Sequence, residues 1–434
     1  MRIPQTGRAP DDVLGDLRAR HDTDVDWRRG RVFSLVYHAS DAHEHLVKQA
    51  HAEYGSANLL NPMAFKSLKQ LEKELVEMAG GLMNGRDVVG TVTSGGTESI
   101  LCAVAAYRDR ARHGGPSRRW WPELVVPRTI HPAFDKAAHY FGVRLVKVDV
   151  RDDLRVDPRA MAKKISRRTI GLVASAPQYP HGVVDPIAEL GEVAQRHGLP
   201  LHVDACVGGF LLPWLEKLGR PVPVWDFRVP GVTSISADLH KFGYAGKGAS
   251  LLLWRSLADL KHQIFVATDF PGGIYASPTM LGTRPGGPIA AAWAALQAQG
   301  EDGYLALAKA AAEAADRLRT GIRALGLRVL PSDSTIVSFA GREVFALADR
   351  LEARGWSVDR MHRPEAIHLT VTANHATIVD EYLADLASAL AEVRADPSLA
   401  KQGTAPMYGM AGKLPVRRLV ARNVRKMIAE MYAP

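Results

Sequence analysis

The sequence predicts an α/β protein with a mostly parallel central sheet, followed by a smaller α+β region. Two observations support this fold class. Short apolar runs alternate with helical stretches from about residue 88 to 254, the pattern of βαβ units whose sheet is covered on both faces. After GTRPGGP at 282–288, a long helical stretch leads into fewer strands. We therefore divide the 434 residues into an N-terminal segment (1–55), a large domain (56–300) and a small C-terminal domain with a tail helix (301–434).

The elements follow in a clear order. Residues 40–85 are helical, with a break at NLLNPM where Asn and Pro interrupt the pattern. In the large domain we expect helices from Thr97, from Pro132, near 157–165 and from Asp185, between strands at VVGTVTSGG, LVVPRT, RLVKVDV, IGLVASAP, LPLHVDAC, VTSISADL and ASLLLWR. In the small domain we expect helices at 301–325, 343–354 and 377–394, strands at LRVLP, STIVSFA and IHLTVTAN, and a final helix after residue 400.

Composition narrows the class of protein. No apolar run approaches the 18 or so residues that span a bilayer, and the first residues lack the apolar core of a signal peptide. The only two cysteines, Cys102 and Cys206, lie in apolar runs and are expected to be buried thiols. These features indicate a soluble, cytoplasmic protein.

The net charge of +9 favours anionic partners, namely phosphorylated small molecules, acidic lipid or nucleic acid. The basic residues are scattered apart from DWRRGR at 26–31 and PVRRLVARNVRK at 415–426. We interpret the second run as a helix with a solvated basic face. No nucleic-acid motif is present, so we expect no nucleic-acid partner.

A glycine turn joins the first strand of the sheet to its helix, at TSGGTESI (93–100). Gly95 and Gly96 allow close approach of a ligand to the backbone, and Thr97 stands at the helix start. Free N–H groups and the positive helix end would hold a phosphate, although two glycines also make a simple tight turn. The turn lacks the Lys-Ser/Thr pair of a Walker loop.

Unusual residues follow the other strands, where open α/β sheets bind ligands. Asp204 ends an apolar strand, where it could pair with a cation, bind a metal or cap a helix. Without an HExxH motif or a spaced Cys/His set, we predict no metal. His131 follows another strand and could stack on a flat cofactor, while Tyr179 lies in an ordinary-looking turn, YPHG.

Lys241 ends the run VTSISADL, with His240 beside it. Lysine forms Schiff bases, best where dry or cationic surroundings lower its pKa. A phosphate turn, a histidine, a strand-end aspartate and then a lysine is the order that a pyridoxal phosphate site requires. The combined pattern therefore predicts that cofactor more strongly than any one motif does.

At this point the segments resemble a known family. TSGGTES, TIHPAFDKAA, YPHGVVDP, HVDACVGGF, SISADLHKFGYAGKG and ASPTMLGTRPGG are similar to the group II pyridoxal-phosphate decarboxylase superfamily, and within it to the sphingosine-1-phosphate lyases. The resemblance runs from about residue 30 to the end and includes NLLNPMAFKSLKQLEKE and the tail motif APMYGMAG. It implies the type I fold of pyridoxal-phosphate enzymes, a homodimer with shared active sites, and a soluble bacterial-type member.

The resemblance also implies residue roles. Lys241 is the Schiff-base lysine, Asp204 pairs with the ring nitrogen and His131 stacks on the ring. The cofactor phosphate is held by Gly95, Gly96, Thr97 and His240, with Thr283 reaching it from the neighbouring subunit. Tyr179 faces the reacting carbons, and the residues assigned to the substrate are Tyr37, Asn61, His202 and Lys247. Asn61 stands where the family often has a phosphate-binding histidine, and Thr283 where a serine is more usual.

The implied reaction is retro-aldol cleavage of sphingosine 1-phosphate, or a related phosphorylated long-chain base, to a fatty aldehyde and phosphoethanolamine. The general base stays open among Tyr179, Lys241, His131 and the substrate phosphate. The alternatives are an amino-acid decarboxylase with the same cofactor, which has no evident need for Lys247 and Tyr37, and a basic binding protein with an inert cofactor site. Peripheral contact with a membrane also stays open.

Overall fold

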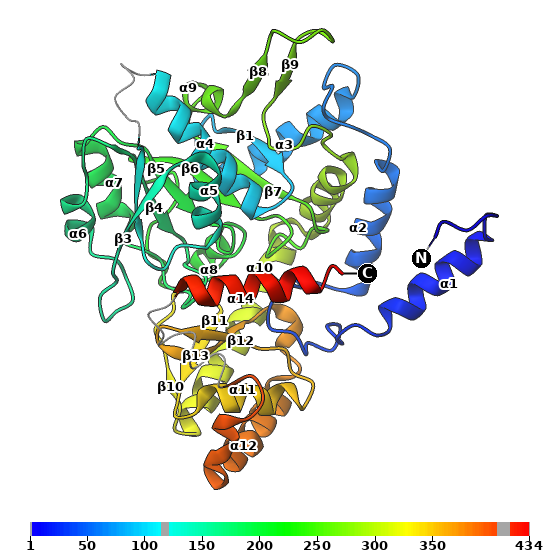
Figure 1. Cartoon of the computed structure of the whole chain (residues 1–434), viewed down its shortest axis with the longest axis vertical. Coiled ribbons are helices and arrows are strands. Elements are labelled where there is room, and N and C mark those ends of the chain that lie inside the picture. The colour runs from blue at the N-terminus through cyan, green and yellow to red at the C-terminus, as the bar shows by residue number, and fades with distance from the viewer. Residues whose placement is uncertain (1, 114–120, 406–416, 434) are drawn as a thin grey trace.

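The computed structural model describes residues 2–113, 121–405 and 417–433. Figure 1 shows a large α/β unit around one sheet and a smaller unit below it, joined by the long helix α10. The tail motif APMYGMAG lies, except for Ala405, outside the described residues.

Within these ranges, the central sheet has seven strands in the order β1-β7-β6-β5-β4-β2-β3. β7 pairs antiparallel with both of its neighbours, and the pairs among the other strands are parallel. The predicted mostly parallel sheet is therefore confirmed. The strands are β1 (Val89–Thr93), β2 (Glu123–Pro127), β3 (Arg144–Val148), β4 (Thr169–Ser175), β5 (Leu201–Asp204), β6 (Val232–Ala237) and β7 (Ser250–Trp254).

Both faces of this sheet are covered, which explains the continuous apolar runs. Adjacent residues of a strand point to opposite faces, and accordingly Leu124 and Val126 belong to one core and Val125 to another. The first core contains α4 (Gly96–His113) and α5 (Ala133–Phe141), and the second contains α3 (Lys66–Leu82), α7 (Ile187–Arg196), α8 (Leu212–Lys217) and part of α10 (Gly286–Ala324). Two shorter helices, α6 (Pro158–Lys163) and α9 (Leu257–Leu260), complete the unit.

Helix α10 begins earlier than the sequence pattern indicates and bends at Gly300, whose φ of 54° and ψ of −176° are not helical. Beyond it lies an antiparallel sheet in the order β10-β11-β13-β12, covered by α11 (Val344–Glu352) and α12 (Val379–Ala395). Its described strands are β10 (Arg328–Val329), β11 (Ile336–Ala340), β12 (Asp359–His362) and β13 (Glu365–Thr370). β12 is absent from the sequence prediction because DRMH has no apolar alternation.

The N-terminal segment connects the two units. Helix α2 (Asp41–Glu53) packs along α10, where His43 Nδ1 lies 2.8 Å from Gln299 Nε2, and His43 Nε2 lies 2.9 Å from the Tyr244 carbonyl oxygen. Before α2, Val32 forms a bridge to Ser357 of the small unit, and the Phe33 ring stacks on His375 at 4.5 Å. This path carries Tyr37 to the junction between the two units.

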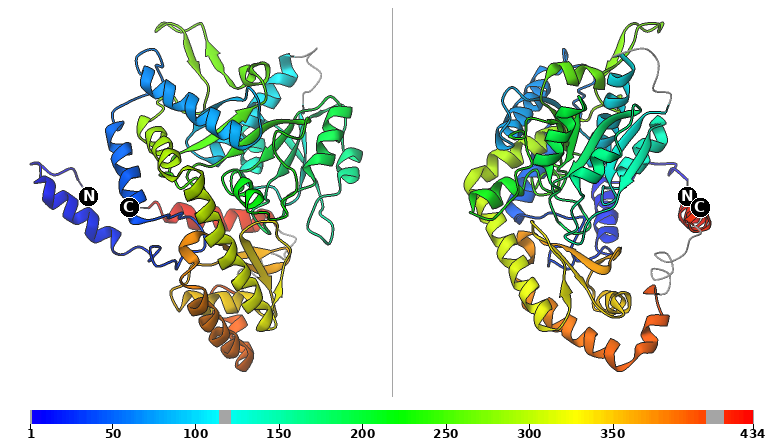
Figure 2. Two further views of the ribbon diagram at one scale, coloured as in Figure 1. Left: turned by 180° about the vertical axis from the view of Figure 1, so that it is seen from behind. Right: turned by 90° about the vertical axis from the view of Figure 1, so that its left-hand side faces the viewer.

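Three segments project from the body. The hairpin of β8 (Phe265–Ala267) and β9 (Tyr275–Ser277), which the sequence analysis does not predict, extends at the top of Figure 1. Helix α1 (Pro10–His21) stands apart from the sheets in Figure 1, and α14 (Arg417–Glu430) does so in the right-hand view of Figure 2. The described part of the predicted basic face, Arg422, Arg425 and Lys426, is exposed.

No helix among the described residues is long and apolar enough to cross a membrane. Cys102 and Cys206 are both free and buried, as predicted.

Candidate active site

The loops after five strands enclose a cavity of about 360 Å³ at one edge of the central sheet. Its walls include the turn 94–98 after β1, His131 after β2, Pro177 and Tyr179 after β4, Asp204 and Cys206 from β5 onward, and Asp238, His240 and Lys241 after β6. Two larger hollows, of about 690 and 830 Å³, contain none of the predicted site residues among the described ranges. The chemistry therefore gathers at the smaller cavity, as expected for strand ends.

The glycine turn brings backbone donors to this cavity. A Cβ atom at Gly96 would lie 2.7 Å from Cys206 Sγ and 2.8 Å from both carboxylate oxygens of Asp238, so only glycine fits there. Among the described residues, no protein group accepts from the N–H groups of Gly96 or Thr97 at the start of α4. Free N–H groups at a helix start form an anion site.

The buried Glu98 fixes the shape of this turn. Its Oε2 accepts from the Ser94 N–H at 2.6 Å, while Oε1 accepts from the N–H groups of Met280 and Leu281 at 2.8 and 3.1 Å. One carboxylate thus ties the glycine turn to the loop that carries Thr283. No motif in the sequence gives Glu98 a role, although a glutamate in the first turn of a helix commonly accepts a hydrogen bond from the backbone N–H just before the helix.

Lys241 and His240 converge on the buried Asp238. Lys241 Nζ lies 3.0 Å from Asp238 Oδ2, and His240 Nε2 lies 3.5 Å from the same oxygen. Burial favours the neutral carboxyl of Asp238, but the charge of Lys241 and the bond from His240 outweigh burial and hold the pKa of Asp238 well below its ordinary value. Burial would lower the pKa of Lys241, but the Asp238 carboxylate keeps that pKa well above its ordinary value.

Asp204 presents a free carboxylate oxygen at the end of β5. Its Oδ1 accepts from the Cys206 N–H at 3.1 Å and the Ser236 hydroxyl at 3.4 Å, while Oδ2 has no partner among the described residues. The free Oδ2 of Asp204 is therefore suitable for pairing with a protonated ring nitrogen. Cys206 lies against Gly96, and burial raises the pKa of its thiol well above the ordinary value.

His131 and Tyr179 form the opposite wall, with ring centroids 6.3 Å apart and planes at 89°. The Tyr179 hydroxyl donates to Asp359 Oδ2 at 2.8 Å, and its ring lies 4.5 Å from that of His368. Both partners come from the small unit. Burial, followed by the charge of Asp359, raises the pKa of Tyr179 far above its ordinary value, so the phenol stays protonated.

Tyr37 and Lys247 lie beside the cavity, on the side of the N-terminal segment. Lys247 Nζ sits 5.1 Å from the centre of the Tyr37 ring and donates to the His240 carbonyl oxygen at 3.1 Å. Lys247 is exposed, although its ammonium group lies against the Tyr37 ring and the His240 carbonyl oxygen. Burial, helped by the charge of Lys241, lowers the pKa of Lys247 to about 8. Burial raises the pKa of Tyr37 to about 12.

The structure brings together most, but not all, of the predicted site residues. His202 is 1% exposed and does not line the cavity; its ring nitrogens lie 2.8 Å from the Ser234 hydroxyl and 3.3 Å from that of Ser236. Burial lowers the pKa of His202 to about 4, so the ring is neutral. Within this chain His202 is linked to Asp204 through the Ser236 hydroxyl, and its contact with a substrate stays a prediction.

Asn61 and Thr283 are exposed and lie outside the cavity of their own chain. The Asn61 side-chain oxygen accepts from the N–H groups of Met63 and Ala64 at 3.1 and 3.2 Å, which shapes the turn before α3. Thr283 Oγ1 lies 3.5 Å from the Asn58 amide.

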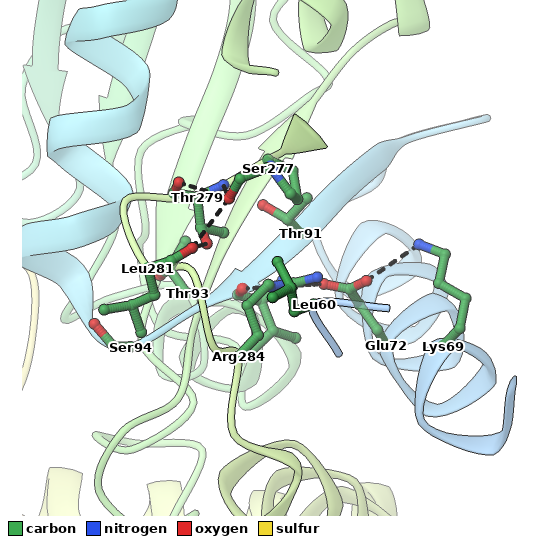
Figure 3. A network of polar contacts seen from close by, with 12 residues as sticks. Leu60, Lys69, Glu72, Thr91, Thr93, Ser94, Ser277, Thr279, Leu281 and Arg284 are labelled. Atoms are coloured by element: carbon green, nitrogen blue, oxygen red, sulfur yellow. Dashed lines mark hydrogen bonds and ion pairs between the residues drawn. The ribbon is translucent and has the colours of Figure 1, made fainter. Parts of the chain in front are cut away.

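The loop that carries Thr283 is firmly held (Figure 3). The buried Arg284 pairs with the buried Glu72 and also donates to the Val92 carbonyl oxygen at 3.0 Å. The Ser277 hydroxyl lies within hydrogen-bond reach of the carbonyl oxygens of Thr279 and Leu281, at 3.1 and 3.0 Å. Burial favours a neutral Glu72, but the Arg284 charge outweighs it and lowers the pKa of Glu72.

Comparison with known proteins agrees with this geometry. Residues 63–340 match the family described as "Pyridoxal-dependent decarboxylase conserved domain". The sphingosine-1-phosphate lyase of Dictyostelium discoideum is 40% identical over 438 residues, which cover 100% of this chain and 82% of the relative.

Two solved structures are also similar. The sphingosine-1-phosphate lyase of Burkholderia pseudomallei has a TM-score of 0.86 and 37% identity, with 91% of this chain and 94% of that chain covered. The glutamate decarboxylase of Lactobacillus brevis has a TM-score of 0.78 at 19% identity, covers 90% of this chain and 94% of that chain, and supports the fold alone.

Proposed function

This chain belongs to the sphingosine-1-phosphate lyases within the pyridoxal-dependent decarboxylase family, and on that premise we propose how its residues work. It is a carbon–carbon lyase that uses pyridoxal 5'-phosphate. The proposed reaction is retro-aldol cleavage of sphingosine 1-phosphate, or a related phosphorylated long-chain base, to a fatty aldehyde and phosphoethanolamine. The observation that carries the proposal is the convergence of Lys241, Asp204, His131 and Tyr179 on one cavity beside Lys247.

The residues of the cavity fit the cofactor. The free N–H groups of Gly96 and Thr97 at the start of α4 suit a phosphate. The free oxygen of Asp204 suits a protonated ring nitrogen, and the amine of Lys241 supplies the covalent attachment. When bound, pyridoxal phosphate provides an electron sink for the pair released as the carbon–carbon bond breaks.

The chain's own groups would then orient the substrate. His131 forms a flat wall against which a ring can stack. Lys247, a cation near Tyr37, is placed to receive the substrate phosphate, and its charge is what an amino-acid decarboxylase would not need. Tyr179 faces the same cavity with its phenol held by Asp359.

Tyr179 can remove a proton from the substrate hydroxyl only under one condition. Its phenol is protonated and already donates to Asp359 Oδ2. A protonated phenol accepts a proton only if it gives up its own, and the Asp359 carboxylate is the acceptor in place. We therefore assign Tyr179 as a relay and Asp359 as the group that receives the proton.

The proposed assembly is a homodimer with shared sites. Exposed Asn61 and Thr283 belong to one rigid surface, held by Glu72 and Arg284, and neither lines its own cavity. Both would complete the partner's site, Thr283 at the cofactor phosphate. We also place the protein in the cytoplasm, with contact to membranes limited to its surface.

Product analysis tests the reaction. The purified chain with pyridoxal phosphate is given sphingosine 1-phosphate, and aldehyde and phosphoethanolamine are measured; Lys241→Ala is the control and should release neither. A panel of amino acids is assayed in parallel for carbon dioxide. Carbon dioxide without aldehyde would replace the lyase proposal with the decarboxylase.

A further inference from the structure

Asp238 is a buried carboxylate for which neither the sequence motifs nor the proposed reaction gives a role. It follows β6 and is 2% exposed. Its Oδ2 contacts Lys241 and His240, whereas the buried Oδ1 has no hydrogen-bond partner among the described residues. Both oxygens press against Gly96, where α4 begins. Burying a carboxylate with one unsatisfied oxygen costs desolvation free energy, and such a group in a folded protein therefore needs an explanation.

The two basic neighbours are oriented by this carboxylate. His240 Nδ1 accepts from the Ala249 N–H at 3.3 Å, which leaves the proton on Nε2, facing Asp238. Lys241 faces Asp238 at 3.0 Å, with Cys206 and Tyr37 as further neighbours, and Lys247 adds a repulsive positive charge. Asp204 and Tyr179 line the same cavity. Of these, Asp238 is the carboxylate in direct contact with the amine.

We propose that Asp238 is a positioning residue that keeps the Lys241 amine protonated and directed into the cavity until the cofactor enters, and then receives its proton. The inference rests on the proposed function only for the role of Lys241 as the cofactor lysine.

The proton balance supports this assignment. An ammonium cannot attack an aldehyde, so Lys241 must lose one proton before its nitrogen could bond to the aldehyde carbon, a condensation in which the aldehyde oxygen would leave as water. Asp238 Oδ2 is the nearest acceptor, at 3.0 Å. An anionic phosphate at Gly96 and Thr97 would sit beside the Asp238 carboxylate, and like charges at that distance favour the neutral carboxyl. Proton transfer from Lys241 to Asp238 therefore also relieves the repulsion that the phosphate creates.

The test uses the cofactor-free protein, so that it does not depend on catalysis. Lys241 is acylated with an amine-reactive anhydride across a pH series, and its modification is read by mass spectrometry of the peptide that contains it. Exposed Lys309 serves as the internal standard. In Asp238→Asn the pH at which acylation of Lys241 is half-maximal should fall by at least about one unit. At a given pH below this midpoint, acylation should therefore be about tenfold faster.

Two further variants make the result specific. Asp238→Glu keeps the charge and should leave the midpoint within a few tenths of a unit of the original value. Asp359→Asn removes a different carboxylate of the same region, one that does not contact Lys241, and should also leave it unchanged. The visible absorbance that develops when pyridoxal phosphate is added should shift to lower pH in Asp238→Asn alone.

An unchanged midpoint in a folded Asp238→Asn variant, or an equal shift in Asp359→Asn, would overturn the proposal. If the midpoint shifts as expected but no aldehyde is formed from sphingosine 1-phosphate, the proposed reaction fails and the role of Asp238 stands. If Lys241 never captures the cofactor in the original protein, both fail together.

Discussion

Replacing Lys247 with methionine removes the charge that we propose binds the substrate phosphate. Methionine keeps much of the chain length and the packing over Tyr37, so the change is mainly electrostatic. In the present structure the ammonium donates to the His240 carbonyl oxygen at 3.1 Å and lies 5.1 Å from the Tyr37 ring centre. A phosphorylated substrate would draw it into a charge-assisted hydrogen bond.

The expected loss follows from the strength of such a bond. Hydrogen bonds to charged groups contribute about 1.5–3 kcal/mol. Because Lys247 is partly solvated and must leave its present acceptor, we take the lower part of this range, about 1.5–2 kcal/mol. At about 1.4 kcal/mol per factor of ten, KM for sphingosine 1-phosphate should rise about 10- to 30-fold, with kcat much less affected.

The pH dependence gives a second, independent readout. The pKa of Lys247 is lowered to about 8, so its charge is present at neutral pH and lost as the pH rises through that value. KM of the original protein should therefore increase above about pH 8, whereas Lys247→Arg should hold KM steady over the same interval because arginine stays charged. Steady-state kinetics with a coupled aldehyde assay measures both effects. An unchanged KM in Lys247→Met would refute the phosphate-binding role.

Three other outcomes test the packing around the site. Gly96→Ala should abolish cofactor binding, seen as loss of visible absorbance, because its Cβ would meet Asp238 at 2.8 Å; Gly81→Ala, with no atom within 4 Å of the added Cβ, should bind normally. Glu72→Gln should lower the free energy of urea unfolding by about 3–5 kcal/mol because it leaves Arg284 buried and unpaired; a loss below about 1 kcal/mol would contradict the ion pair. Since the pKa of Glu72 is depressed in the folded chain, this stabilisation should also fade as the pH falls. Asp359→Asn should lower the pKa of Tyr179, measured by ultraviolet titration against Tyr179→Phe, and reduce kcat; an unchanged kcat would exclude the proton relay.

Sequence reasoning located the chemistry well because it relied on strand ends. Parallel strands place their carboxyl ends at one edge of the sheet, so Asp204, His131, Tyr179 and Lys241 had to meet once the βαβ pattern was recognised. The same reasoning could have found Asp238, which also ends an apolar strand. Its position alone does not distinguish it from the histidine and lysine that follow it, because only the fold shows which side chains meet.

His202 shows that a position on a strand does not by itself fix how deeply a side chain is buried. Residues i and i+2 share a face of a strand, so His202 belongs to the same side as Asp204. Two residues, however, correspond to roughly 6.6 Å of strand, and that distance takes the ring from the edge of the sheet into its core. Burial depth along a strand depends on the neighbouring strands, whose order no local pattern specifies.

The sequence by itself determined the fold class and the family, because these depend on local periodicity and on motifs at strand ends, and it predicted which residues would hold the cofactor. The division at residues 55 and 300 and the role of each site residue remain proposals. Only the tertiary structure decided which charges meet: Asp359 reaches Tyr179 from the small unit, Glu98 holds the loop that carries Thr283, and Asp238 faces Lys241. Ion pairs and hydrogen bonds act over a few ångströms, and contacts between distant segments are fixed by packing rather than by spacing along the chain.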